Sequence, residues 1–402
     1  MITPSTATYR SISISKYQGN PLIEALPAAL TVEDLMQRTT TLPQCPKNLA
    51  ELSRLERKML AEDIGLAFVT PQQSIRLYEE IYLSLCEGYL ARNPLGETFK
   101  HSLYRIRDPF GPPLPGSKTG STSLLLIGPT GFGKTAIARS VFSQFPTVIE
   151  HHQYGDRPLK LKQVVYLKID CPSNGSSRAL INNIWRAFDN ALGTNYCEQY
   201  RKSGMKVPDL QVQIAIACAS HAVGILVVDE VHYLRPVLED NDKERATLPF
   251  VDELLNGIGV PVLLIGTWKS ARLLNRSATT TRRVCSGLTL AEYAYRANDR
   301  YWRKLVDTLW EYQCCLKPAP LNDSLHADIH RYSGGLPALL TKLLKAGQKR
   351  AIDTGHETVD ASILNQVYQH EFVLLHDALS ALRRGDCARF EDLLPRQPLS
   401  EI

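Results

Sequence analysis

Residues 123–135 read SLLLIGPTGFGKT, a short apolar run that leads directly into the pattern G-x-x-x-x-G-K-[ST]. This pattern is typical of a strand followed by a phosphate-binding loop and a helix; the alternative is a glycine turn at the surface. Glycines in the loop permit backbone angles that let consecutive N–H groups point at a triphosphate. Lys134 would meet the terminal phosphates, and the Thr135 hydroxyl at the helix start can bind Mg²⁺. The residues expected to contact the nucleotide are Gly128, Pro129, Thr130, Gly131, Phe132, Gly133, Lys134, Thr135 and Ala136.

A second motif, GILVVDE at 224–230, is an apolar strand that ends in two carboxylates. If this strand lies in the same parallel sheet as the phosphate loop, Asp229 can hold Mg²⁺ and Glu230 can polarise the attacking water. An acidic turn that closes a core strand is the alternative. The neighbouring phosphate-loop pattern favours the metal and hydrolytic roles.

A third strand, VPVLLIGTWKS at 260–270, places Thr267 where its hydroxyl can sense the terminal phosphate or hold the lytic water. The alternative is that Thr267 caps the following helix. Four arginines follow. In a ring ATPase an arginine here can reach the γ-phosphate of the neighbouring subunit. Surface solvation is the alternative for most of Arg272, Arg276, Arg282 and Arg283, of which we favour Arg282 or Arg283 because they precede the last strand.

Apolar runs separated by helical stretches predict an α/β fold with a parallel five-stranded sheet between helices. Those runs are 123–128, 163–170, 224–229, 260–267 and 287–290. Beyond residue 292 the apolar period is helical throughout. These later helices are predicted at 298–313, 321–333, 336–353, 359–372 and 374–385.

The 402-residue chain is long enough for two or three domains. Three or four helices between residues 30 and 94 predict an N-terminal helical module, and the Pro- and Gly-rich stretch RDPFGPPLPGSKTGST predicts a linker. The predicted organisation is a flexible tail (1–29), the helical module (30–106), the linker (107–122), the α/β nucleotide-binding domain (123–291), a helical lid domain (292–385) and a C-terminal tail (386–402).

A net charge of +5 permits nucleic-acid contact without arguing for it, and none of the nine cysteines forms a C-x-x-C pair. No apolar run approaches the ~20 residues that cross a bilayer. We therefore expect a soluble, cytoplasmic protein with no membrane partner.

The order of these motifs resembles the AAA+ ATPases over about residues 100–350. More narrowly, four stretches resemble the TnsC/TniB ATPases of multi-subunit bacterial transposons: YLKIDCPSNGSSRALINNIWRAFDNALG, VVDEVHYL, LLIGTWKSARLL and RYSGGLPALLTKLL. The resemblance implies a bacterial, ATP-dependent regulator that assembles on double-stranded DNA as a ring or filament. It also implies a TniQ-type target selector and a DDE transposase as partners. Lys134 and Thr135 would bind ATP and Mg²⁺, while Asp229 and Glu230 would serve metal and hydrolysis.

The chain departs from the AAA+ pattern after its double glycine. Many AAA+ lids carry an arginine there, whereas SGGLPALL places Ala338 near that position. Direct sensing of the nucleotide by the lid is therefore in doubt. Lys342, one turn later, is a possible substitute, although the leucines around it would simply pack the lid helix.

Contacts to DNA would have to come from outside the nucleotide pocket. Lys160, Lys162 and Lys168 lie on or beside the second predicted strand, and Arg178 starts the next helix. As a group they suit sequence-independent phosphate contact, while surface solvation is the alternative for each one. Two other functions remain open, namely another AAA+ initiator or helicase loader and a nucleotide-dependent signalling switch.

Overall fold

The computed structural model describes residues 3–90, 92–96, 123–234, 260–270 and 286–394 of the chain. These residues divide into two compact units, which we describe separately. The first unit takes its described residues from Met1–Leu30, Gln73–Ile127 and Ala138–Ala291, and the second from Thr31–Gln72, Gly128–Ile137 and Glu292–Ile402.

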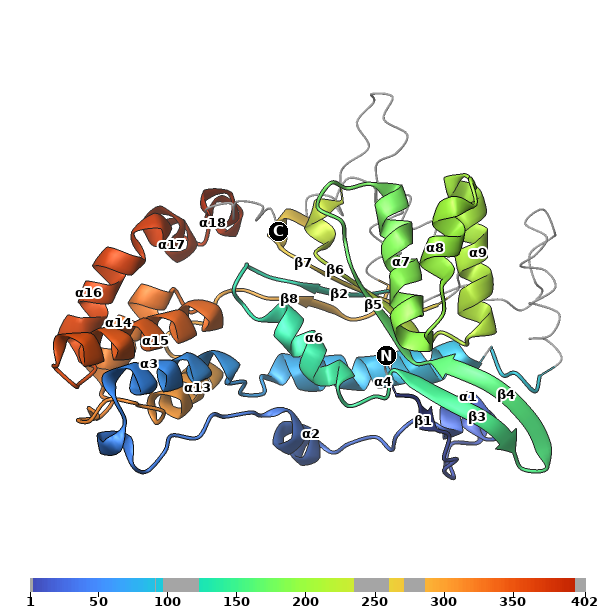
Figure 1. Cartoon of the computed structure of the whole chain (residues 1–402), viewed down its shortest axis with the longest axis horizontal. Helices are drawn as coiled ribbons and strands as arrows, with labels where there is room; N and C mark the ends of the chain where they lie inside the picture. Colours follow the sequence, from blue (N-terminus) through green and yellow to red (C-terminus); the bar gives the residue numbers. More distant parts are fainter. Residues whose placement is uncertain (1–2, 91, 97–122, 235–259, 271–285, 395–402) are drawn as a thin grey trace. The chain divides into compact units, whose positions relative to one another are not determined.

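A five-stranded parallel sheet is the centre of the first unit (Figure 1). Its apolar runs are buried along their whole length in three of the strands, as expected where helices flank a parallel sheet. The strand order is β5 (Tyr166–Asp170), β6 (Ile225–Asp229), β7 (Val262–Gly266), β2 (Ser123–Ile127) and β8 (Thr289–Ala291). The predicted α/β class and five-stranded sheet are confirmed.

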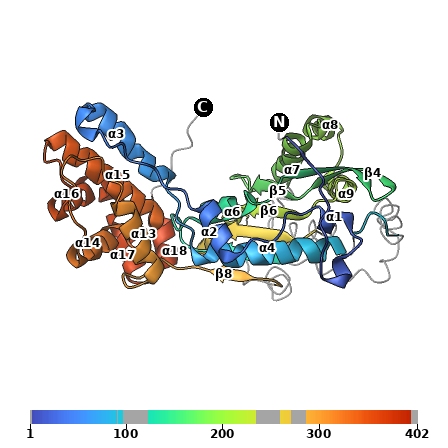
Figure 2. The same cartoon turned by 90° about the horizontal axis from the view of Figure 1, so that it is seen from below.

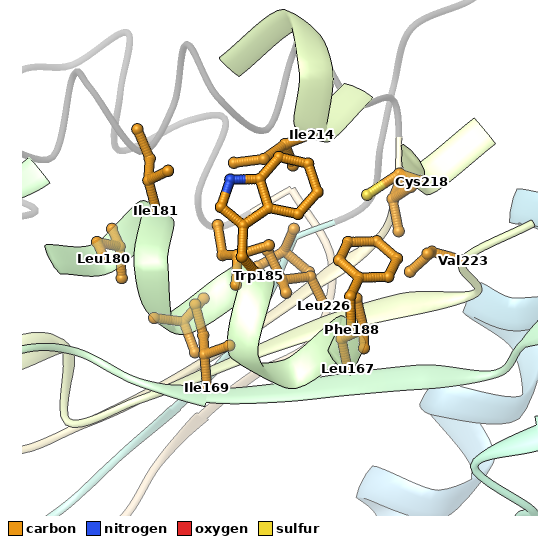
Figure 3. Packing of buried hydrophobic residues seen from close by; sticks show 14 of the residues in the cluster. Leu167, Ile169, Leu180, Ile181, Trp185, Phe188, Ile214, Cys218, Val223 and Leu226 are labelled. Atoms are coloured by element: carbon orange, nitrogen blue, oxygen red, sulfur yellow. The ribbon is translucent and has the colours of Figure 1, made fainter. Parts of the chain in front are cut away.

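The helices α7 (Ser177–Leu192) and α9 (Val207–Ser220) pack on one face of this sheet, with α8 (Tyr196–Lys202) between them in the sequence. Trp185 and Phe188 of α7 are fully buried among side chains of β5 and β6 (Figure 3). This packing fixes the two strands whose carboxyl ends carry the candidate acidic residues.

The first unit also contains a smaller sheet that the sequence did not suggest. In it β3 (Val148–Tyr154) pairs antiparallel with β4 (Arg157–Val164), and β1 (Ser5–Thr6) pairs parallel with β3. The single strand predicted at 163–170 is therefore two strands, because β4 ends at Val164 and β5 begins at Tyr166.

Residues before position 30 are packed in the structure, whereas we expected a flexible tail. After the turn η1 (Ser15–Tyr17), the short helix α1 (Pro21–Glu24) buries Leu22 and Ile23 completely. The Gln163 amide donates to the Leu22 carbonyl oxygen at 2.9 Å. This apolar burial and hydrogen bonding account for the difference.

The long helix α4 (Gln72–Leu90) lies beside the large sheet (Figure 2). A Cβ atom placed on Gly224 would lie 2.5 Å from Leu85 and from Tyr89, so only glycine allows this approach. On the other side of the phosphate loop from β2, α6 (Lys134–Phe142) follows and crosses from one unit into the other.

The second unit is helical. The lid helices agree with those predicted, and the region expected as a C-terminal tail contributes one further helix on which Phe390 is buried. They are α13 (Arg300–Trp310), α14 (Asp323–Ser333), α15 (Pro337–Thr354), α16 (Ala361–Glu371), the turn η5 (Val373–Leu375), α17 (His376–Arg383) and α18 (Cys387–Leu393).

Part of the expected N-terminal module belongs to this second unit. Its elements are α2 (Val32–Thr39), η2 (Leu49–Glu51), α3 (Arg54–Glu62) and η3 (Asp63–Leu66). Arg57 of α3 forms a two-pronged ion pair with Glu357 just beyond α15, at 2.5 and 2.8 Å. The segment expected at 30–106 thus contributes α2 and α3 to the helical unit and α4 to the sheet unit.

Candidate functional site

The loop after β2 has the backbone that phosphate binding requires. Gly131 and Gly133 have φ angles of +85° and +99°, a region that side chains disfavour. Gly128 is needed for space, since a Cβ atom there would lie 3.2 Å from Glu292. The Ile137 N–H donates to the Gly133 carbonyl oxygen at 2.9 Å and begins the regular bonding of α6. A loop followed by a helix N-terminus is suited to an anion.

Lys134 lies inside this loop, with only 9% of its surface exposed. Its Nζ donates to the carbonyl oxygens of Gly128 and Pro129 at 2.9 and 3.0 Å. The loop therefore holds its own cation among main-chain atoms, which is the charge expected to meet a terminal phosphate.

The lid contacts the phosphate loop through main-chain atoms. The Ala338 N–H donates to the Gly131 carbonyl oxygen at 3.1 Å, and the Phe132 ring stacks on Tyr295 with ring centroids 5.0 Å apart. The ammonium of Lys342 lies over the Phe372 ring, 4.9 Å from its centroid. The described lid thus meets the loop with an amide and an aromatic ring at the positions considered for an arginine.

The carboxyl edge of the sheet carries the two expected acidic residues. Asp229 ends β6 with 3% of its surface exposed, and its Oδ1 accepts the Glu230 N–H at 2.9 Å. Glu230 has a φ of +58°, a left-handed backbone that is uncommon for a residue with a side chain. Its Oε2 lies 3.1 Å from Nδ1 of His232. Such outliers cost about 1–3 kcal/mol and gather at functional sites.

A lysine and a cysteine complete this edge. Lys168 of β5 reaches across the sheet, so that its Nζ lies 3.2 Å from Oδ2 of Asp229. Burial raises the pKa of the Cys171 thiol to about 12, so this group is a neutral thiol at neutral pH. The Cys171 N–H donates to the Asp229 carbonyl oxygen at 2.9 Å, which extends the main-chain pairing beyond the strands.

Thr267 lies at the carboxyl end of β7 and is 6% exposed. Its Oγ1 accepts the Lys269 N–H at 3.3 Å, the geometry of a helix cap. The four candidate arginines, Arg272, Arg276, Arg282 and Arg283, lie outside the described residues.

The basic residues considered for DNA are not gathered at one place. Lys160 and Lys162 lie on β4, where Lys160 is exposed and Lys162 pairs in register with Glu150. Arg178 is the second residue of α7, and its Nη1 donates to the Met205 carbonyl oxygen at 3.2 Å. Their contact with DNA stays a prediction.

The residues of the loop and the sheet edge suit a magnesium nucleotide. Among the described residues there is no group of three or more His, Cys, Asp or Glu side chains that could hold a metal by themselves. Magnesium usually needs only one or two carboxylates together with phosphate oxygens and water. The Thr135 hydroxyl and the Asp229 carboxylate are oxygen ligands of that kind.

Within the described residues, no helix has the length and apolar character to cross a membrane.

Comparison with known families matches residues 118–274 to a model described as an AAA domain. No curated protein matches the sequence. The fold is similar to several solved structures at low identity, none of which has a TM-score above 0.45 among the three given next. They are the Thermotoga maritima RuvB Holliday junction branch migration motor (16% identity, TM-score 0.35, 64% of this chain and 63% of that one), the Aeropyrum pernix Orc1 protein in complex with DNA (17%, 0.42, 71% and 68%) and Cdc6p from Pyrobaculum aerophilum (15%, 0.45, 81% and 81%). The chain thus spans less than two thirds of that RuvB chain.

The AAA-domain match covers both the phosphate loop and the Asp-Glu strand, and the sheet has the corresponding parallel P-loop architecture. The chain carries an AAA domain and is an AAA+ ATPase.

Proposed function

We propose that this AAA+ ATPase binds ATP with Mg²⁺ at residues 128–136 and uses hydrolysis to control a DNA-bound assembly in transposition. Bound Mg²⁺ would neutralise phosphate charge, with Thr135 and Asp229 as its protein ligands. Lys134 would bind the terminal phosphates, and Glu230 would orient and polarise the attacking water.

Two further roles complete the proposed hydrolytic machinery. The Thr267 hydroxyl would sense the terminal phosphate, and its present bond to the Lys269 amide fixes where that hydroxyl lies. Arg282 or Arg283 would act on the ATP of a neighbouring subunit, which would make hydrolysis depend on assembly.

The transposition role rests on one observation, the resemblance of four stretches of the sequence to TnsC/TniB ATPases. The proposed protein forms a ring or filament on double-stranded DNA, receives a TniQ-type selector and recruits a DDE transposase. Hydrolysis would then dismantle the assembly. The exposed lysine on β4 and its neighbours would supply sequence-independent phosphate contacts.

The ATPase roles are tested by Lys134→Ala and Glu230→Gln. We expect Lys134→Ala to abolish nucleotide binding and with it ATP-dependent DNA association. Glu230→Gln should keep ATP binding, lose turnover and lengthen the lifetime of the oligomer. Lys202→Ala is a matched control, because Lys202 forms only an exposed ion pair with Glu198. Unchanged turnover and oligomer lifetime in Glu230→Gln would refute the hydrolytic role.

The assembly is tested by electron microscopy of the protein with ATP, Mg²⁺ and random duplex DNA, beside samples that lack either nucleotide or DNA. Rings or filaments on DNA only when ATP is present would support the proposal, and binding of a TniQ protein and a transposase would then be measured. A sequence-specific footprint would instead favour an initiator or helicase loader. Particles indifferent to DNA would favour a signalling switch.

A further inference from the structure

Lys168 lies within the row of acidic residues at the carboxyl edge of the sheet. In the parallel pairing of β5 with β6, Asp170 is directly opposite Asp229, and Lys168 is two residues earlier on the same face of β5. Its Nζ lies 3.2 Å from Oδ2 of Asp229 and 3.9 Å from Oδ1 of Asp170. Like charges directly opposite each other destabilise a sheet, so one ammonium near both carboxylates offsets their repulsion.

The burial of Asp229 makes this partner important. The Asp229 side chain is 4% exposed, whereas that of Lys168 is 36% exposed. A buried carboxylate is costly unless hydrogen bonds and a counter-charge compensate it. Lys168 reaches the buried carboxylate from the neighbouring strand while part of its own side chain stays in water.

The carboxylate of Asp229 is held at both oxygens. Oδ2 lies next to the ammonium of Lys168, and Oδ1 accepts the N–H of Glu230, whose backbone is left-handed. A rotation of the carboxylate would therefore disturb the bond that helps to keep Glu230 in this backbone conformation. Lys168 is connected to Glu230 through Asp229.

We infer that Lys168 is a positioning residue of the ATPase site, which orients Asp229 and weakens the affinity of the site for Mg²⁺. This inference rests on the proposed roles of Asp229 and Glu230. The ammonium and a bound Mg²⁺ repel each other across the same carboxylate, so the lysine raises the Mg²⁺ concentration at which nucleotide binds. The same ammonium keeps Asp229 and the Glu230 backbone in place for hydrolysis.

This position also separates Lys168 from the basic residues of β4. Transfer of its ammonium to a DNA phosphate would leave the buried Asp229 without the only counter-charge printed by the geometry of the described strands β5 and β6. Lys168 is therefore assigned to the nucleotide chemistry of the sheet edge and not to DNA contact.

The test compares Lys168→Met and Lys168→Arg with Lys160→Met. The Lys160→Met control removes the same charge from an exposed position on β4 of the same unit. Binding of a fluorescent ATP analogue is titrated with Mg²⁺, and ATP turnover is measured separately at saturating Mg²⁺. Circular dichroism and thermal unfolding establish that each variant is folded.

For Lys168→Met we expect the half-saturating Mg²⁺ concentration to fall about ten-fold, because one nearby positive charge is removed. Turnover at saturating Mg²⁺ should also fall about ten-fold, because the acidic groups lose their orientation. Lys168→Arg keeps the charge and should keep the wild-type Mg²⁺ dependence within about three-fold. Lys160→Met should match the wild type in both measurements.

An unchanged Mg²⁺ dependence and turnover in Lys168→Met would overturn the inference, and so would equal shifts in Lys160→Met. A loss of stability with no shift in Mg²⁺ dependence would show a merely structural ion pair, which also overturns it. If Lys168→Met does not fold, Lys168→Gln is measured against the same expectations. If the wild-type protein itself binds no nucleotide with Mg²⁺, the proposed function fails and the inference fails with it.

Discussion

The amide of Ala338 is hydrogen-bonded to the carbonyl oxygen of Gly131 at 3.1 Å. This bond joins the first turn of α15 to the main chain of the phosphate loop. The Phe132 ring beside it stacks on Tyr295, and the Tyr295 N–H donates to the Gly335 carbonyl oxygen at 3.0 Å. A change in the loop backbone would therefore reach two parts of the lid without a charged side chain as intermediary.

Gly131→Ala should weaken nucleotide binding by about ten-fold or more, because the loop can no longer hold its left-handed φ without strain of about 1–2 kcal/mol. Isothermal titration with ATP measures the effect. Gly355→Ala is the matched control, since Gly355 has a φ of +72° with open space around it and ends α15 away from the loop. A similar loss of affinity in both variants would attribute the effect to general destabilisation.

Arg57→Met should destabilise the helical unit by about 3 kcal/mol, because it leaves the carboxylate of Glu357 without its charged partner. The two side chains are 4% and 13% exposed, and Glu357 also accepts the Leu316 N–H at 3.2 Å. Denaturant unfolding followed by hydrogen exchange in α3 and α15 measures the loss.

The neighbouring pair provides the control for that variant. Lys58 also pairs with a residue at the end of α15, Asp353, but both side chains are much more exposed at 30% and 55%. Lys58→Met should therefore change stability by no more than about 1 kcal/mol. Equal losses in Arg57→Met and Lys58→Met would contradict the role of burial.

The same pair predicts an acid limit to stability. The hydrogen bonds from Arg57 hold the pKa of Glu357 below its usual range, although partial burial opposes this shift. A carboxyl group with a lowered folded-state pKa stabilises the protein above its unfolded pKa, about 4.3, and loses that contribution as the pH falls through the folded value. Unfolding measured between pH 7 and pH 3 should show this loss, and Glu357→Gln should have a shallower acid dependence.

Trp185→Ala should destabilise the sheet unit by about 3–5 kcal/mol, since it leaves a cavity in the core. The ring is fully buried and stacks on Tyr200 with centroids 4.4 Å apart. Trp185→Phe keeps an aromatic ring and should cost less. Hydrogen exchange in α7 and β5 measures both, and an equal cost for the two variants would argue against packing as the cause.

The sequence was sufficient for the elements that repeat a strong local pattern. The glycines and lysine after β2 are set by local backbone chemistry, and the apolar runs of the sheet and the lid helices have clear periods. The left-handed conformations of Gly131 and Gly133 follow from the motif alone.

The remaining features depend on contacts between residues far apart in the sequence. Val164 and Tyr166 belong to different sheets, yet the apolar run through them has no break that a period could reveal. Likewise, nothing local to α3 or α4 says that one packs with the lid and the other beside the sheet. The pairing of Lys168 with Asp229 needed the order of the strands, although a lysine two residues before a strand end was a signal of an edge position.

The pairing of β1 with β3 has a consequence for how the protein folds during synthesis. Ser5 lies opposite Ile149, so the partner of the first strand is made about 140 residues later. At about 5–20 residues per second, the ribosome needs roughly 7–30 s to supply it. Through that interval the apolar side chains of α1 wait without their final neighbours on β4, and a chaperone that holds the nascent N-terminus would act in this period.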